Sequence, residues 1–261
     1  MDWIYTSAGF LVGAVVGLTG VGGGALMTPI LVMLLGVPPA LAVGTDLWFA
    51  ALTKTVGGLV HSRRGSVDWQ VVRQLYLGSI PASVLTIIWL QSSDIDRVSN
   101  GVIVTALGCV LLLSATATLF RKQTQSWGTA LRTRVPVNFK RIQPILTVIA
   151  GAVLGLLVTL TSVGGGALGI VILVFLYPFR MNPAKLVGTD IVHAIPLTLI
   201  AGFGYLWMGN VDFLLLGKLL LGSIPGIIIG SMLSTKIPET LLRTTIAVIL
   251  SALGIKLLLS Y

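Results

Sequence analysis

Long apolar runs follow one another along the chain, separated by short polar connections. A helix of about 20 apolar residues is long enough to cross a membrane core of about 30 Å. The runs lack the alternation of polar and apolar residues that is typical of membrane strands. The pattern therefore predicts an all-α integral membrane protein with ordinary spans near residues 40–60, 70–91, 98–120, 184–207, 213–234 and 240–259.

Two further apolar runs, near residues 6–36 and 143–177, are interrupted by three consecutive glycines. A continuous helix of about 31 residues would be about 46 Å long, which exceeds the membrane core. Glycine weakens helices, so each run is expected to break into two short helices. Whether each broken run is a re-entrant hairpin or a pair of short spans stays open at this point.

The chain contains two copies of the same pattern. Thr19–Leu26 and Thr161–Leu168 are identical at seven of eight positions, 142 residues apart. Three later segments recur 144 residues apart, and they begin with Val43-Gly-Thr-Asp46, Val67-Asp68 and Leu77-Gly-Ser-Ile-Pro81. The common order predicts an internal duplication. It divides the chain into a first transmembrane repeat, a basic linker that is expected to be cytoplasmic, and a second transmembrane repeat, at residues 1–120, 121–141 and 142–261.

The basic residues indicate how the two halves are oriented. If each broken run returns to its starting side, thirteen basic residues lie on the side of the linker and three on the other. If each broken run is a single span, the numbers become eleven and five. Because basic residues concentrate in cytoplasmic loops, this distribution favours returning hairpins and two inverted halves.

Composition agrees with a membrane protein and narrows the function. Hydrophobic residues make up 55% of the chain and charged residues 10%, with a mean hydropathy of +1.00. The net charge of +9 would also suit nucleic acid, but six of the 17 basic residues lie in the linker, so no nucleic-acid partner is expected. We also expect no metal, cofactor or enzymatic activity, because no motif for them is present.

The paired glycine breaks are the first candidate site. A broken helix carries free backbone groups and the positive end of a helix dipole into the membrane, where they can bind an anion. The alternative is that small residues simply allow close helix packing. The candidate substrate-binding residues are Gly22, Gly23 and Gly24 in the first half and Gly164, Gly165 and Gly166 in the second.

Each half then carries a Gly-Thr-Asp early in an apolar span. Carboxylates are rare within membranes and usually face a cavity or a proton relay. Asp46 and Asp190 are therefore expected to couple transport to protons, or to hold the broken backbone in place by hydrogen bonds. Thr45 and Thr189 are expected to donate hydroxyl hydrogen bonds to the substrate.

Two ionisable residues have no counterpart in the other half. Lys54 lies well inside a predicted span and could attract an anion or neutralise Asp46, or it could extend towards an interface. His193 follows Asp190 by three residues and could exchange a proton with it, or it could be a packed histidine. Two further aspartates are expected to cap the helices that follow them: Asp68 and Asp212.

The breaks Val21-Gly-Gly-Gly-Ala-Leu26 and Val163-Gly-Gly-Gly-Ala-Leu168, each followed by Val-Gly-Thr, resemble the TauE/SafE sulfite exporter family. The resemblance covers essentially the whole chain. It implies a permease for sulfite, organosulfonates or other small sulfur-containing anions. Where many members have a serine after Gly-Thr, this chain has Asp46 and Asp190, and these carboxylates would repel an anion unless they are protonated or paired.

The sequence therefore predicts a secondary transporter in a bacterial inner membrane. It would move a small anion, a sulfur oxyanion or an organosulfonate, by alternating access between the halves, with proton coupling through the aspartates. A passive anion channel and a non-transporting membrane subunit that binds a partner are the alternatives.

Overall fold

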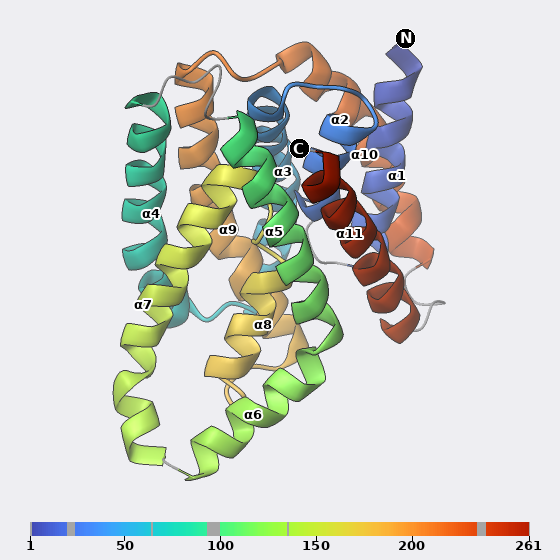
Figure 1. The fold of residues 1–261 in the computed structure, drawn as a ribbon. Coiled ribbons are helices and arrows are strands. Elements are labelled where there is room, and N and C mark those ends of the chain that lie inside the picture. Colours follow the sequence, from blue (N-terminus) through green and yellow to red (C-terminus); the bar gives the residue numbers. More distant parts are fainter. Residues whose placement is uncertain are drawn as a thin grey trace.

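The computed structural model describes residues 2–19, 24–63, 65–92, 100–134, 136–233 and 239–260, and their regular structure is entirely helical. The first half contains α1 (Asp2–Thr19), α2 (Gly24–Met33), α3 (Pro39–Arg63), α4 (Trp69–Ser92) and α5 (Asn100–Leu119) (Figure 1). Next comes α6 (Arg121–Arg134). The second half contains α7 (Pro136–Thr161), α8 (Ala167–Leu176), α9 (Pro183–Trp207), α10 (Phe213–Leu233) and α11 (Glu239–Ser260).

The predicted all-α membrane architecture is confirmed. The six ordinary spans correspond to α3, α4, α5, α9, α10 and α11, with ends that differ from the prediction by at most three residues. Among the described residues, six helices are long and apolar enough to cross a membrane, namely α4, α5, α7, α9, α10 and α11. α3 has 25 residues and is also long enough, but it carries Asp46 and Lys54 in its interior.

The two glycine-broken runs each form one longer and one short helix. α2 and α8 have 10 residues each, so each is about 15 Å long, half the thickness of a membrane core. Gly22 and Gly23 lie outside the described residues, and α2 begins at Gly24. In the second break, Gly164 and Gly166 have φ angles of 127° and 130°, which side chains of L residues rarely adopt.

Helices of one half pack mainly on helices of the other. α1 packs on α10, α4 on α7, α3 on α9 and α5 on α11. The α1–α10 pair is held at close range by glycines spaced four residues apart, and a methyl group on any of them would overlap the backbone of the partner helix: Gly9, Gly13 and Gly17 of α1, and Gly222, Gly226 and Gly230 of α10. Small residues allow such close approach in membranes, so these glycines join the two halves.

The first helices of the two halves run in opposite directions. In Figure 1, α1 descends from the N-terminus at the top, whereas α7 rises from the bottom of the view. The connector before α4 and the connector between α8 and α9 lie on the same side, since Asp68 and Arg180 form an ion pair at 2.7 Å. Returning hairpins would place these two connectors on one side, whereas two parallel halves would place them on opposite sides. The inverted arrangement of the halves stays a prediction.

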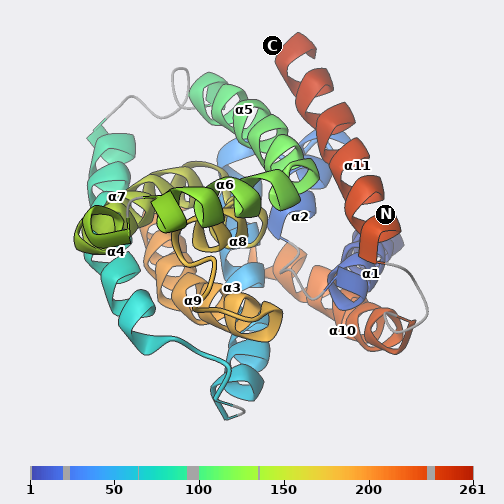
Figure 2. The same cartoon turned by 90° about the horizontal axis from the view of Figure 1, so that it is seen from below.

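The linker is largely helical. Residues 121–134 form α6, and α7 already begins at Pro136, so the boundary expected at residue 142 falls inside α7. Residues 121–134 are rich in good helix formers, and proline is favoured at a first helical position. Seen from below, α6 crosses in front of α8 (Figure 2), and Gly128 lies against the backbone of Phe175. We call the side of the molecule on which α6 lies the linker side.

The close packing of α1 and α10 leads to a first prediction. Gly226→Ala is expected to lower the free energy of unfolding by about 1–3 kcal/mol, because the added methyl group overlaps the carbonyl of Phe10. Gly217→Ala on the same helix meets no atom within 4 Å and should be neutral or slightly stabilising. Thermal unfolding of both variants in detergent tests this expectation, and equal melting temperatures would contradict the packing described.

Candidate functional site

The two Gly-Thr-Asp segments belong to α3 and α9, which pack on each other. The carboxylates are deeply buried: Asp46 is 0% exposed and Asp190 2%. Lys54 follows Asp46 on α3 and is 6% exposed. The structure thus brings three ionisable side chains from the two halves into one interior region, next to the second glycine break.

Lys54 connects the first half to the break of the second half. Its Nζ donates a hydrogen bond to the carbonyl oxygen of Gly165 at 3.2 Å. Lys54 also interacts electrostatically with Asp190 and Asp46. Within the described residues it makes no other hydrogen bond and no ion pair within 4.0 Å. An ammonium group has three N–H donors, so two are left for a further acceptor. The side chain does not extend to an interface, which was the alternative interpretation.

Asp46 is held by a residue of the short helix α2. The hydroxyl of Thr28 donates to Oδ2 of Asp46 at 2.5 Å. The side chain of Ser162, from the second break, lies beside the same carboxylate. Within the described part of the chain, Oδ1 of Asp46 and Oγ of Ser162 are nevertheless buried without a hydrogen bond of normal geometry. This side of the carboxylate therefore has capacity for a proton or another donor.

Asp190 is held in a different way. Its carboxylate lies directly over Gly169 in the first turn of α8, where a methyl group would overlap Oδ1. The backbone N–H of Gly166 is also directed at this carboxylate. Asp190 thus contacts the start of α8, and backbone donors at a helix start stabilise negative charge.

Thr45 and Thr189 fasten the two halves to each other. The hydroxyl oxygen of Thr45 accepts a hydrogen bond from the backbone N–H of Asp212 at 3.1 Å. The hydroxyl oxygen of Thr189 accepts one from the backbone N–H of Asp68 at 3.0 Å. Each hydroxyl keeps its own hydrogen for donation, so a contact with the substrate stays a prediction. The observed role is to join each central helix to the opposite half.

The predicted helix caps are confirmed. Oδ1 of Asp212 accepts hydrogen bonds from the backbone N–H groups of Leu214 and Leu215, both at 2.9 Å. Oδ1 of Asp68 accepts one from the backbone N–H of Val71 at 3.4 Å. Each carboxylate thereby supplies a partner for backbone donors that a helix start leaves unpaired.

His193 is directed towards α4. Its Nε2 lies 2.9 Å from Oγ of Ser79, and its ring centroid lies 5.5 Å from that of Tyr76. The side chain is 1% exposed. These contacts are those of a packed, hydrogen-bonded histidine, and a proton exchange with Asp190 stays a prediction.

Besides Ser162, two residues of this site were not singled out from the sequence: Thr28 and Gly169. Alignment of the two halves does not point to Thr28 or Gly169, because neither residue is repeated: Thr28 corresponds to Ile170 and Gly169 to Met27. A polar residue in the short apolar run after the break was the available signal for Thr28. Among the described residues, no group of three His, Cys, Asp or Glu side chains could hold a metal ion.

Paired short helices, buried charged side chains and apolar helices in two matching halves are typical of membrane transport proteins. The chain belongs to the sulfite exporter TauE/SafE family, whose model matches residues 5–257. It is 39% identical to the probable membrane transporter protein YjnA of Bacillus subtilis over 81% of this chain and 82% of that protein. It is 26% identical to a probable membrane transporter protein of Haemophilus influenzae over 77% of this chain and 72% of that protein. No solved structure matches the chain.

Proposed function

We propose that this multi-pass protein is a secondary transporter that carries a small anion, a sulfur oxyanion or an organosulfonate, across the inner membrane of a bacterium. The two halves would be inverted, and alternating access would arise from their movement around the α3–α9 contact. The family to which the chain belongs is described as a sulfite exporter. The charged side chains of the site are our reason for proposing that this chain also carries an anion.

The observation that carries the proposal is the buried ammonium of Lys54. A buried cation is costly unless it is paired. Here it is held by the Gly165 carbonyl and keeps two N–H donors. A small oxyanion beside Lys54 could accept these donors and lie close to the start of α8, where the positive end of the helix dipole also favours it.

The two carboxylates give the reason for proton coupling. With both aspartates charged and Lys54 charged, the site has a net charge of −1. An anion entering this interior would raise the negative charge further, and repulsion between like charges is strong where water is excluded. Uptake of protons by Asp46 or Asp190 would remove this repulsion. With a monovalent anion bound and a proton on each of the two aspartates, the loaded site could change access with no net charge.

Counterflow in reconstituted liposomes tests the proposed function. Vesicles loaded with sulfite, thiosulfate, sulfoacetate or taurine are diluted into a trace of the same labelled compound. We expect transient accumulation of the label with at least one of these compounds, because a carrier exchanges bound substrate across the membrane. Lys140→Met, which removes an exposed charge on the linker side, is the matched control and should behave as the unmodified protein.

Two other outcomes have distinct meanings. Movement of an anion without counterflow would indicate a passive channel. Absence of movement for all four compounds would contradict a carrier of small sulfur-containing anions.

A further inference from the structure

The internal duplication places two equivalent connectors on opposite sides of the molecule. One joins α8 to α9 on the linker side, and the other joins α2 to α3 at the opposite end, at the top of Figure 1. Each connector lies beside the start of a helix from the other half, which begins after Asp68 or after Asp212. Because the duplication makes the two regions equivalent, their residues can be compared one by one.

On the linker side, the connector is clamped to the other half by an ion pair. Nε and Nη2 of Arg180 lie 2.7 and 2.9 Å from the two carboxylate oxygens of Asp68. Nη2 also donates to Oε1 of Gln70 at 2.8 Å, and Nζ of Lys185 lies 3.5 Å from Asp68. A bidentate guanidinium–carboxylate pair is the strongest and most specific arrangement of this kind.

Tyr177 fills the space behind this ion pair. Its hydroxyl lies 2.7 Å from the hydroxyl of Thr147 and donates to Oε1 of Gln74 at 3.0 Å. Burial raises the pKa of the Tyr177 phenol, so the phenol keeps the proton that it donates. Val71, in the first turn of α4, is 0% exposed. Described side chains therefore fill the region behind the Arg180–Asp68 pair.

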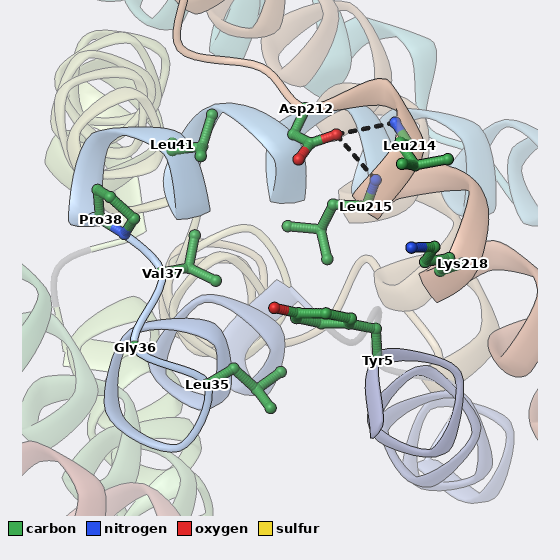
Figure 3. A pocket seen from close by; sticks show the side chains of 10 residues that line it. All are labelled: Tyr5, Leu35, Gly36, Val37, Pro38, Leu41, Asp212, Leu214, Leu215 and Lys218. Carbon is green, nitrogen blue, oxygen red and sulfur yellow. Dashed lines mark hydrogen bonds between the residues drawn. The ribbon is translucent and has the colours of Figure 1, made fainter. Parts of the chain in front are cut away.

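At the opposite end, the equivalent region is a cavity of about 260 Å³ (Figure 3). Tyr5 of α1 and Lys218 of α10 line it, and these residues correspond to Thr147 and Gln74 of the linker side. Leu35 lines it where the linker side has Tyr177. Within the described chain, Asp212 bonds its own helix start and forms no ion pair.

Both regions are connected directly to the central site. The backbone N–H of Asp68 bonds Thr189, the neighbour of Asp190. The backbone N–H of Asp212 bonds Thr45, the neighbour of Asp46. Each helix start is therefore joined by one hydrogen bond to the residue that precedes a buried aspartate.

We propose that the cavity bounded by Tyr5, Asp212 and Lys218 is the entrance by which the small anion reaches the site from the side opposite the linker. The Arg180–Asp68 pair is the gate that closes the equivalent entrance on the linker side. This inference rests on the proposed transport function. Under this proposal, the structure represents the state in which the site is closed on the linker side. Arg180 then acts as a positioning residue for the step in which the site opens to the linker side.

Thiol labelling at two equivalent positions tests the gate. In a Cys109→Ser background, one variant carries Val71→Cys and the other Leu215→Cys, which lie 144 residues apart at corresponding places. Leu215 lines the cavity and is 6% exposed, whereas Val71 is 0% exposed. A membrane-impermeant maleimide is applied to each side of membranes of known orientation. We expect the cysteine at 215 to react from the side opposite the linker and the cysteine at 71 to be protected.

Removal of the clamp should reverse this protection. Arg180→Ala is expected to increase labelling at position 71 from the linker side by about fivefold, the effect of losing about 1 kcal/mol from an accessible ion pair. Arg180→Lys should give an intermediate increase, because lysine cannot make the bidentate contact. Arg73→Ala, on the same helix as position 71, is the control and should leave labelling unchanged.

Salt offers a test that needs no substitution at Arg180. The Arg180 side chain is 41% exposed, so raising the ionic strength from about 0.01 M to about 1 M should screen the pair and increase labelling at position 71. Unchanged labelling at position 71 in Arg180→Ala and at high salt would overturn the gate. An unreactive cysteine at 215 would overturn the entrance. Labelling does not depend on which compound is carried, so failure of the counterflow experiment is distinguishable from failure of this proposal.

Discussion

Replacing Lys54 with methionine is expected to reduce counterflow of the transported anion by about 30-fold or more. The substitution keeps most of the side-chain volume and removes the ammonium that donates to the Gly165 carbonyl. Truncating one partner of a buried, hydrogen-bonded charged contact costs about 2 kcal/mol or more, which corresponds to this factor in affinity. Initial rates of counterflow at several substrate concentrations measure the loss.

Two controls separate the charge of Lys54 from its contribution to the fold. Lys54→Arg keeps a positive charge and should retain a measurable rate, because a guanidinium can also donate to Gly165 and to an anion. Thermal unfolding should show whether Lys54→Met still folds. A folded Lys54→Met protein that transports the anion at the unmodified rate would show that the anion does not bind at this lysine.

The second large effect is expected at the two aspartates. In the unmodified protein, transport of the anion should slow as the pH rises, because charged Asp46 and Asp190 repel the substrate. Replacing both with asparagine fixes the site in its neutral form. The doubly substituted protein should therefore bind the anion at alkaline pH as it does at acidic pH, and a proton gradient should no longer drive accumulation. Transport rates between acidic and alkaline pH, with and without a gradient, check this expectation.

Asp94→Asn is the matched control for these aspartates. Residue 94 lies between α4 and α5 in the sequence, outside both Gly-Thr-Asp segments. The pH profile of this variant should therefore keep the shape of the unmodified protein. A double asparagine variant whose pH profile also keeps that shape would argue against proton coupling through the carboxylates.

The spans could be predicted because lipid contact imposes a simple rule on the sequence. Trp69–Ser92 was expected at 70–91 and Pro183–Trp207 at 184–207, since polar residues flank each apolar run. The duplication also indicated which residues should be equivalent, and Thr45 and Thr189 indeed make equivalent contacts with Asp212 and Asp68. The partners of these threonines could not be predicted, because they come from the opposite half.

Contacts that occur in only one of the two halves also could not be predicted from the sequence. Lys54 and Gly165 are 111 residues apart, and no feature near either residue identifies the other. In the sequence, Gly169 cannot be distinguished from other glycines of apolar helices. Only the packing of Asp190 against it shows that it makes room for this carboxylate. The helical linker was missed for another reason, since a basic segment between spans resembles an irregular loop unless its helix propensity is considered.

Direct binding of the anion tests the central claim, that Lys54 and the second glycine break form the substrate site. Purified protein in nanodiscs is titrated with the labelled anion that shows counterflow, in parallel for the unmodified chain, Lys54→Met and Lys140→Met. The account predicts saturable binding to the unmodified chain and to Lys140→Met, and affinity weakened by about 30-fold or more in Lys54→Met. Equal affinity in all three proteins would contradict it.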